Sequence, residues 1–274
     1  MTTTRASTTH SVASRDGTSI GYTSSGAGRP LVVVHGTSAD HRRWGSVRPL
    51  LEAGRAVHAV DRRGRGLSGD GAHYSIEREY EDVAAVVDAV AEADGTGVDV
   101  MGHSYGALCV LGAAALTSRA RRIVLYEPPA DAGGLARPEV LDELDALLTQ
   151  GRRSDAVASF FRTVVGVPER ELELIRALPT WHDRTAAAHT IARELRSSGG
   201  YRLDPQRVRA VTAPVLLLLG GESPAPFRSG TEQVARTLPD ARVGILPGQQ
   251  HIAMDTAPEL FAEAVDSFLA DAGE

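Results

Sequence analysis

A serine lies at the centre of the pentapeptide Gly102-His103-Ser104-Tyr105-Gly106, which matches the pattern G-x-S-x-G. The pentapeptide follows an apolar run at residues 98–101 that predicts a buried strand, and it precedes an apolar helical pattern. A serine on such a sharp strand-to-helix turn has a strained backbone that projects its Oγ into the crevice, while glycines let strand and helix pass closely. This context favours a nucleophilic serine over a glycine-rich structural turn.

A histidine near the end of the chain is the best candidate for the base. A serine hydroxyl is a weak nucleophile on its own, so a base within hydrogen-bond reach must accept its proton. Among the nine histidines, His251 follows the last predicted strand and precedes the last predicted helix. That position lies at the carboxyl edge of a parallel sheet, where ligands bind. We therefore predict His251 as general base, the alternative being that His251 is merely a histidine of a surface loop. We expect His103 to point elsewhere on its turn.

Two backbone N–H groups are candidates for an oxyanion hole. The tetrahedral intermediate of acyl transfer develops an oxyanion that backbone N–H groups most often stabilise. Thr37 lies in a loop directly after the apolar run 31–34, and Tyr105 directly follows the candidate nucleophile. We predict the N–H groups of Thr37 and Tyr105 as the donors, the alternative being that the dipeptide His35-Gly36 merely ends a strand.

The elements that must position these residues alternate along the chain. Short apolar runs predict strands that are buried on both faces of a parallel sheet, and helical patterns lie between most of them. The sequence therefore predicts the α/β class. Between residues 126 and 215 only helical patterns occur, which we interpret as a helical insertion over the sheet. The predicted strands are 31–34, 56–60, 98–101, 123–126, 215–219 and 243–246, and the predicted helices are 76–93, 105–116, 139–149, 155–165, 168–178, 185–196, 230–238 and 258–270.

Composition and charge exclude several classes of protein. The chain has 274 residues, 42% of them hydrophobic, which suffices for one large domain or two small ones. A net charge of -6 argues against binding to nucleic acid or to a membrane surface. All 29 basic residues are arginine, which excludes chemistry that needs a lysine, and a single cysteine excludes an intrachain disulfide. Without an apolar leader pattern or a long apolar run, we expect a cytoplasmic protein.

These features together resemble the α/β-hydrolase superfamily over nearly the whole chain. The resemblance rests on His35-Gly36, the glycine-rich stretch 61–69, the turn 102–106 and His251 near the end. It implies an eight-stranded, mostly parallel sheet with helices on both faces and a helical cap inserted after strand six. We accordingly expect a core domain of residues 1–130 and 209–274, and a cap insertion of residues 131–208.

The acid that orients the imidazole has two candidates. Most members of the superfamily carry an aspartate after the strand that corresponds to residues 215–219, whereas this chain has Glu222 there, in a slightly early register. Glu127 directly follows the run 123–126, a position that some members use, and two prolines after it fix the turn. We favour Glu127 because of its register and its rigid turn, and we keep Glu222 as the alternative. One buried acceptor is enough to orient the imidazole of His251.

Other signals in the sequence are weaker. Residues 64–69 match the dinucleotide pattern G-x-G-x-x-G, but a loop rather than a helix follows them, so we expect their arginines to pair with nearby acids. No metal-ligand spacing stands out, and we expect Cys109 to be a small core residue. The aromatic residues Phe160, Phe161 and Trp181 of the insertion either line a substrate pocket or form its core.

The sequence thus predicts a serine hydrolase that needs no cofactor or metal. We expect it to cleave an ester, lactone or thioester of a small, largely apolar substrate through an acyl-enzyme. A serine nucleophile argues against dehalogenase and epoxide-hydrolase chemistry, which uses an aspartate in this superfamily. The alternatives on the same fold are a lyase, a perhydrolase, a cofactor-free oxygenase or a receptor that only binds its ligand. A small molecule is the expected partner, rather than nucleic acid or a membrane, and the sequence leaves the oligomeric state open.

Overall fold

The computed structural model describes residues 7–130, 137–199 and 201–270, and its centre is one eight-stranded sheet. The strands are β1 (Thr8–Ala13), β2 (Ser19–Gly26), β3 (Arg29–Val34), β4 (Arg55–Val60), β5 (Val98–His103), β6 (Ala120–Tyr126), β7 (Val215–Gly220) and β8 (Ala241–Leu246). They follow the order β1-β2-β4-β3-β5-β6-β7-β8, and only the pairs β1 with β2 and β2 with β4 are antiparallel. The predicted α/β fold with a mostly parallel sheet is confirmed.

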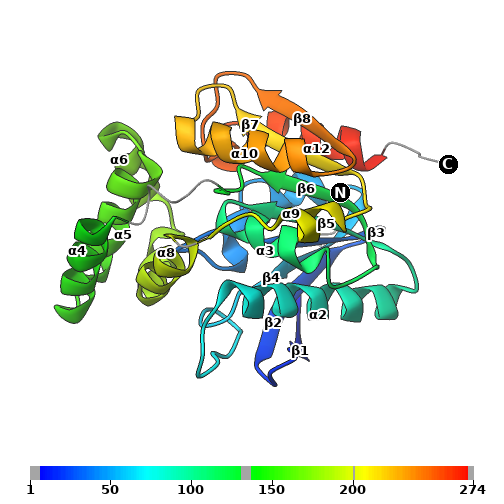
Figure 1. Ribbon diagram of the computed structural model, residues 1–274, viewed down its shortest axis with the longest axis horizontal. Coiled ribbons are helices and arrows are strands. Elements are labelled where there is room, and N and C mark those ends of the chain that lie inside the picture. The colour runs from blue at the N-terminus through cyan, green and yellow to red at the C-terminus, as the bar shows by residue number, and fades with distance from the viewer. Residues whose placement is uncertain (1–6, 131–136, 200, 271–274) are drawn as a thin grey trace.

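Helices cover both faces of the sheet and form a separate group at one end of the molecule (Figure 1). Within the ranges that the structure describes, every helix falls short of the length or apolarity that a bilayer crossing needs. The helices are the α-helices α1 (Arg48–Leu51), α2 (Ile76–Asp94), α3 (Tyr105–Ala113), α4 (Pro138–Thr149), α5 (Arg153–Ser159), α6 (Glu169–Ala177), α7 (Trp181–Ala186), α8 (Ile191–Gly199), α9 (Pro205–Arg209), α10 (Ala225–Thr237), α11 (Ala253–Thr256) and α12 (Pro258–Ala270), the 3₁₀ turns η1 (His41–Trp44) and η4 (Ala188–Thr190), and the π-helix η3 (Phe160–Val165).

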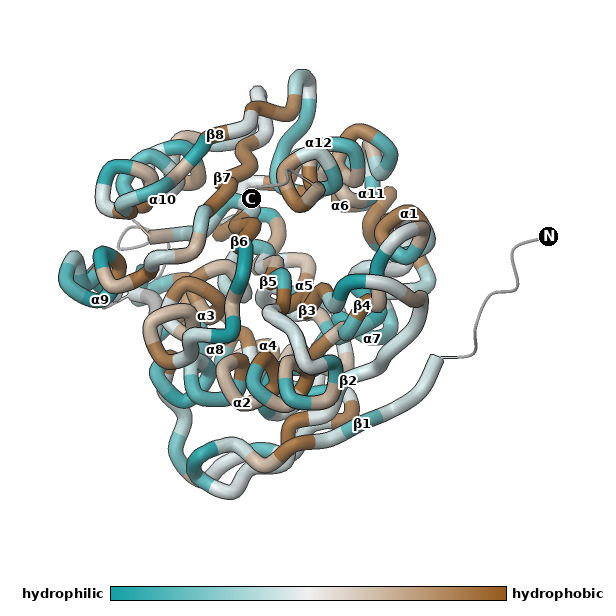
Figure 2. Tube along the Cα trace, turned by 90° about the vertical axis from the view of Figure 1, so that its right-hand side faces the viewer, coloured by the Kyte–Doolittle hydropathy of each residue, from teal (hydrophilic) through white to brown (hydrophobic). Residues whose placement is uncertain are grey.

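The central strands are apolar on both sides because each separates two cores. In β3, Val32 and Val34 pack into the core beneath α2, α3, α9 and α10, whereas Leu31 and Val33 pack into the core beneath η1, α1 and α12. This alternation follows from the two-residue period of side chains along a strand. Figure 2 shows the same hydrophobic character along β7, in contrast to the pale, polar β1. The catalytic candidates at the ends of these strands are therefore mounted on a rigid, doubly covered scaffold.

The edges of the sheet differ from the sequence prediction. Strands β1 and β2 were not among the predicted apolar runs, because β1 is exposed along almost its whole length and carries polar side chains. The run 243–246 does form a strand, but the expectation that it is buried on both faces is wrong. As the edge strand β8, it leaves Val243 47% and Ile245 51% exposed.

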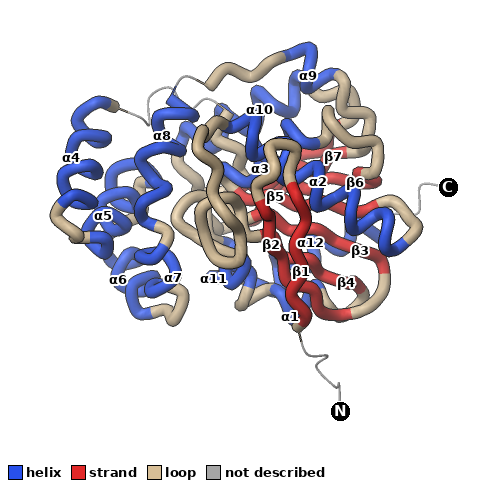
Figure 3. Tube along the Cα trace, turned by 90° about the horizontal axis from the view of Figure 1, so that it is seen from below, coloured by secondary structure: helices blue, strands red, loops and turns tan. Residues whose placement is uncertain are grey.

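The group of helices from α4 to α8 lies between β6 and β7 in the chain and away from the strands in space (Figure 3). It has its own apolar core, which Phe227 of α10 and Ile252 also join. The predicted helix 155–165 is α5 continued by the π-helix η3, and the predicted helix 185–196 is divided among α7, η4 and α8. The predicted first residue of the cap, position 131, lies outside the described residues, so the domain boundaries stay a prediction.

Candidate active site

Ser104 lies on a strained turn between β5 and α3. Its backbone has φ 55° and ψ −125°, a conformation that residues other than glycine rarely adopt. The Ser104 N–H donates to the carbonyl of Tyr126 at 2.8 Å, and the Ser104 carbonyl accepts from the Ala107 N–H at 2.8 Å. Hydrogen bonds on both sides thus hold the strained residue at the carboxyl end of β5, as expected of a nucleophile elbow.

The glycine after the elbow lets α3 approach β3. A Cβ atom at Gly106 would lie 2.3 Å from the carbonyl oxygen of His35 and 2.4 Å from that of Val34. Both contacts are to backbone, which cannot move aside as a side chain would. The position therefore excludes every larger residue.

We expect Gly106→Ala to destabilise the protein by about 3 kcal/mol, because the added methyl group forces α3 away from β3. Urea unfolding followed by circular dichroism measures this effect. Gly54→Ala is the matched control, since a Cβ there meets no heavy atom within 4 Å, and its free energy of unfolding should change little. Equal stability of the two variants would contradict the packing argument.

His251 lies in the loop between β8 and α11 and is 6% exposed. Its Nδ1 lies 2.5 Å from Oε2 of Glu127, and its ring stacks on that of Phe227 with the centroids 3.9 Å apart. With Nδ1–H donating to the carboxylate, Nε2 is left as the proton acceptor. Ser104 and His251 line the same cavity, so the structure brings the two predicted residues together.

The loop that carries His251 is fixed on both sides. The hydroxyl of Tyr126 donates to the carbonyl of Gln250 and accepts from the N–H of Ala253 at 3.1 Å. Nε2–H of His103 donates to the carbonyl of His251 at 2.9 Å, so this buried histidine positions the His251 loop rather than acting as a base, and its Nδ1 has no partner among the described residues. Burial, together with the neighbouring His251, holds the pKa of His103 well below its usual range, which keeps the ring neutral. No pattern in the sequence indicates this positioning contact.

Glu127 is fully buried and has φ 50°, a second strained backbone at the end of the neighbouring strand β6. Its Oε1 accepts from the Gly220 N–H at 2.8 Å and from the hydroxyl of Ser223, which leaves Oε2 for His251. Glu222 is exposed at the surface. The structure therefore brings Glu127 to the imidazole and leaves Glu222 away from it. Ser223 is a further residue of this cluster that sequence analysis missed.

The loop after β3 lies against Ser104. A Cβ at Gly36 would be 3.0 Å from Cβ of Ser104, and Thr37 lines the cavity beside it. Tyr105 is the first residue of α3, so its N–H belongs to the free donors of the helix N-terminus. The assignment of the Thr37 and Tyr105 N–H groups as oxyanion donors stays a prediction.

His35 holds the conformation of that loop. Its Nε2 accepts from the Arg62 N–H at 3.3 Å, so Nδ1–H donates to the carbonyl of Gly36 at 2.8 Å. Burial and the charge of Arg62 hold the pKa of His35 well below its usual range, so the ring is neutral, as this arrangement requires. His35 thus acts on the site by positioning its backbone.

The cavity beside Ser104 is small, and side chains of η3 and α7 form part of its lining. Its volume is about 20 Å³, room for roughly one water molecule, so a substrate must displace part of its lining. Phe160 and Phe161 of the π-helix η3 line it and also belong to the apolar core of the helical group, so both predicted roles apply to them. Trp181 does not, and its indole N–H instead donates to Oγ of Ser154 at 3.1 Å.

A model of the alpha/beta hydrolase family matches residues 31–264. The chain belongs to this family. A solved structure of an alpha/beta hydrolase from Sphaerobacter thermophilus shares 36% identity with it, covers 95% of this chain and 100% of its own, and superposes with a TM-score of 0.81. The 2-hydroxy-6-oxo-6-(2'-aminophenyl)hexa-2,4-dienoic acid hydrolase of Metapseudomonas resinovorans is 25% identical over 90% of this chain and 86% of its own. The 2-(acetamidomethylene)succinate hydrolase of Mesorhizobium japonicum is 26% identical over 89% of both chains. These relatives support hydrolase activity.

The glycine-rich stretch 61–69 of this hydrolase has a structural role. Arg62 binds the carboxylate of Glu79 at 2.6 and 2.7 Å, and Arg63 binds that of Asp82 at the same distances. The arginines of the loop therefore pair with nearby acids, as expected. Cys109 is buried in the core next to α2, and burial raises the pKa of its thiol well above its usual value.

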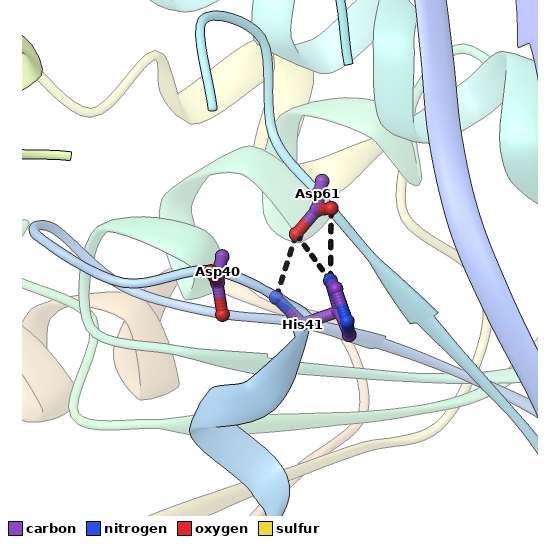
Figure 4. Close-up of side chains that lie close together, drawn as sticks. All are labelled: Asp40, His41 and Asp61. Atoms are coloured by element: carbon purple, nitrogen blue, oxygen red, sulfur yellow. Dashed lines mark hydrogen bonds and ion pairs between the residues drawn. The ribbon is translucent and has the colours of Figure 1, made fainter. Parts of the chain in front are cut away.

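One cluster of metal-ligand type was not anticipated from the sequence. Ligand atoms of Asp40, His41 and Asp61 lie within 4.8 Å of one another (Figure 4). Both carboxylates already accept hydrogen bonds: Asp61 from the backbone N–H and Nδ1 of His41 and from the Leu67 N–H, Asp40 from the guanidinium of Arg42. These hydrogen bonds give the cluster a structural role, because His41 and Asp61 connect the loop after β3 to the loop after β4.

Proposed function

We propose that this alpha/beta hydrolase cleaves an ester-type bond, in an ester, lactone or thioester, through an acyl-enzyme on Ser104. The observation that carries the proposal is the buried contact of His251 with Glu127, 2.5 Å apart, together with the cavity that His251 shares with the strained Ser104. A hydroxyl beside an oriented imidazole is the arrangement that makes serine nucleophilic at neutral pH.

In the proposed reaction, Oγ of Ser104 attacks the substrate carbonyl while Nε2 of His251 accepts its proton. The Glu127 carboxylate stabilises the imidazolium that forms. The N–H groups of Thr37 and Tyr105 donate to the oxyanion of the tetrahedral intermediate. The intermediate then collapses, His251 returns the proton to the leaving group, and water releases the acyl group from Ser104 by the reverse sequence of proton transfers.

Hydrolysis of another bond is the second candidate. Relatives of this chain are named as hydrolases of 2-hydroxy-6-oxo dienoic acids and of 2-(acetamidomethylene)succinate, and another as N-formylmaleamate deformylase. These names favour an oxo acid or an amide as competing substrates. The residues proposed above would act in the same roles, since the triad is defined by geometry rather than by the leaving group.

A trapped intermediate tests the proposal. We expect protein that is mixed with p-nitrophenyl butyrate and quenched with acid to gain the mass of one butyryl group, on the peptide that contains Ser104. The reason is that the proposed mechanism splits into acylation and deacylation, so the covalent state is populated when deacylation is slow. Protein labelled beforehand with a fluorophosphonate is the control. Turnover without any acyl group on Ser104 would favour lyase chemistry instead.

A further inference from the structure

A buried arginine from the cap faces the same cavity as the candidate nucleophile. Arg184 of α7 is 3% exposed and lines the cavity together with Ser104 and His251. Its Nη1 donates to the carbonyl of Ser38 at 3.2 Å, and its guanidinium lies over the ring of Phe161, 5.0 Å from the centroid. Its Nε is buried and has no hydrogen-bond partner among the described residues. This is an unsatisfied cationic donor group in the proposed active site.

The acids nearest to this guanidinium are held by other arginines. Arg42 pairs with Asp183 at 2.8 Å and with Asp40 at 3.0 Å. Asp255 pairs with Arg43, which also lines the cavity, at 2.7 Å. Among the residues described, no carboxylate lies within 4.0 Å of a nitrogen of Arg184. Among the described residues, the guanidinium of Arg184 thus has donors for an anion and no carboxylate that accepts from them.

Arg184 keeps its charge at neutral pH. Burial, together with the neighbouring Arg43, lowers the pKa of Arg184 to about 9, which still leaves the guanidinium protonated at pH 7. A buried charge without a counter-ion is destabilising, and charged groups that burial perturbs cluster at functional sites. A planar guanidinium with free N–H groups fits a carboxylate, which accepts two parallel hydrogen bonds.

We propose that Arg184 binds a carboxylate of the substrate, so that this hydrolase acts on short acyl compounds that carry a negative charge near the scissile bond. A single unpaired guanidinium matches one carboxylate group of the ligand, and the small cavity favours a short spacer. Ser38, whose carbonyl holds Arg184, follows Thr37, so the bound carboxylate would lie on the oxyanion side of the cavity. The proposal rests on the proposed function for the reacting bond, and it replaces the largely apolar substrate that the sequence analysis predicted.

Two esters of the same shape separate charge from size. We expect p-nitrophenyl hemisuccinate to have a higher kcat/KM than p-nitrophenyl 4-methylpentanoate, its uncharged counterpart. Arg184→Gln should lower kcat/KM for the hemisuccinate about 30-fold or more, mainly through KM, because the buried ion pair is lost. The same variant should change the neutral ester by less than about threefold. Arg176→Gln, at a partly exposed arginine of α6, is the matched control and should alter neither ester.

Calorimetric titration of the wild-type protein supplies a readout that needs neither turnover nor a variant. We expect succinate to bind and the uncharged succinamide to bind at least about tenfold more weakly, because only the carboxylate pairs with Arg184. Equal binding of the two compounds, or equal kcat/KM for the two esters, would overturn the proposal and leave the serine hydrolase standing. If neither ester is cleaved but succinate binds selectively, the proposed function fails and the carboxylate site holds.

Discussion

Replacing Ser104 by alanine is expected to lower kcat for p-nitrophenyl butyrate by about 10⁴-fold or more. The variant keeps the buried pair of His251 and Glu127 but has no hydroxyl for the imidazole to deprotonate. Residual turnover would then come only from binding and from the backbone donors of the oxyanion hole. Initial rates measure the loss, and labelling by a fluorophosphonate, followed on a gel, should disappear completely.

The control for this prediction is Ser11→Ala, a substitution on the exposed strand β1 far along the sheet from the elbow. It should keep wild-type turnover and wild-type labelling. Circular dichroism of both variants shows whether the fold is retained. If the Ser104→Ala protein is folded and retains full turnover, Ser104 is not the nucleophile, whichever bond the enzyme cleaves.

The sequence predictions of Ser104 and His251 depend on local structure. A serine between glycines, directly after an apolar run, already implies the strand, the turn and the helix that follow it. His251 was found for a similar reason, because the end of a late strand in a parallel sheet fixes which edge a residue reaches. Predicting both positions requires only the order of strands and helices along the chain. The spacing of the apolar residues indicates that order.

The choice between Glu127 and Glu222 shows where such reasoning stops. Both follow an apolar strand, and both precede proline within a few residues. What separates them is the backbone of Glu127, whose φ of 50° turns its carboxylate inward, where Gly220 and Ser223 donate to it. Those donors lie at and just after the end of another strand. A contact between distant segments of the chain therefore decides which glutamate reaches His251.

Arg184 was missed for the same reason. It lies among polar residues of a short cap helix, where nothing in the local sequence marks it. Only the packing of the cap on the loop after β3 buries its guanidinium beside the elbow. Strand β1 escaped prediction because exposure of an edge removes the apolar signal on which the analysis relied. Strand β2 is internal and has four buried residues, but only Ile20 and Tyr22 among them have large apolar side chains.

The second large effect is expected for Glu127→Gln, which should lower kcat by about 10⁴-fold. Gly220 N–H and the Ser223 hydroxyl both donate to Oε1, so the glutamine carbonyl oxygen stays at that position and the amide NH₂ faces His251. An NH₂ group there donates to Nδ1 and forces the proton of the ring onto Nε2. A ring protonated at Nε2 cannot accept the proton of Ser104, so the loss should fall on kcat for every substrate.

Glu222→Gln is the matched control, because it makes the same chemical change at the exposed rival position and should leave kcat within about twofold of wild type. Stopped-flow measurement of acylation separates the chemical step from product release in both variants. Fluorophosphonate labelling should slow in Glu127→Gln, since the same base activates the serine toward both reagents. Mild losses of equal size in the two variants would mean that neither carboxylate orients the imidazole. The 2.5 Å contact between Glu127 and His251 would then be structural.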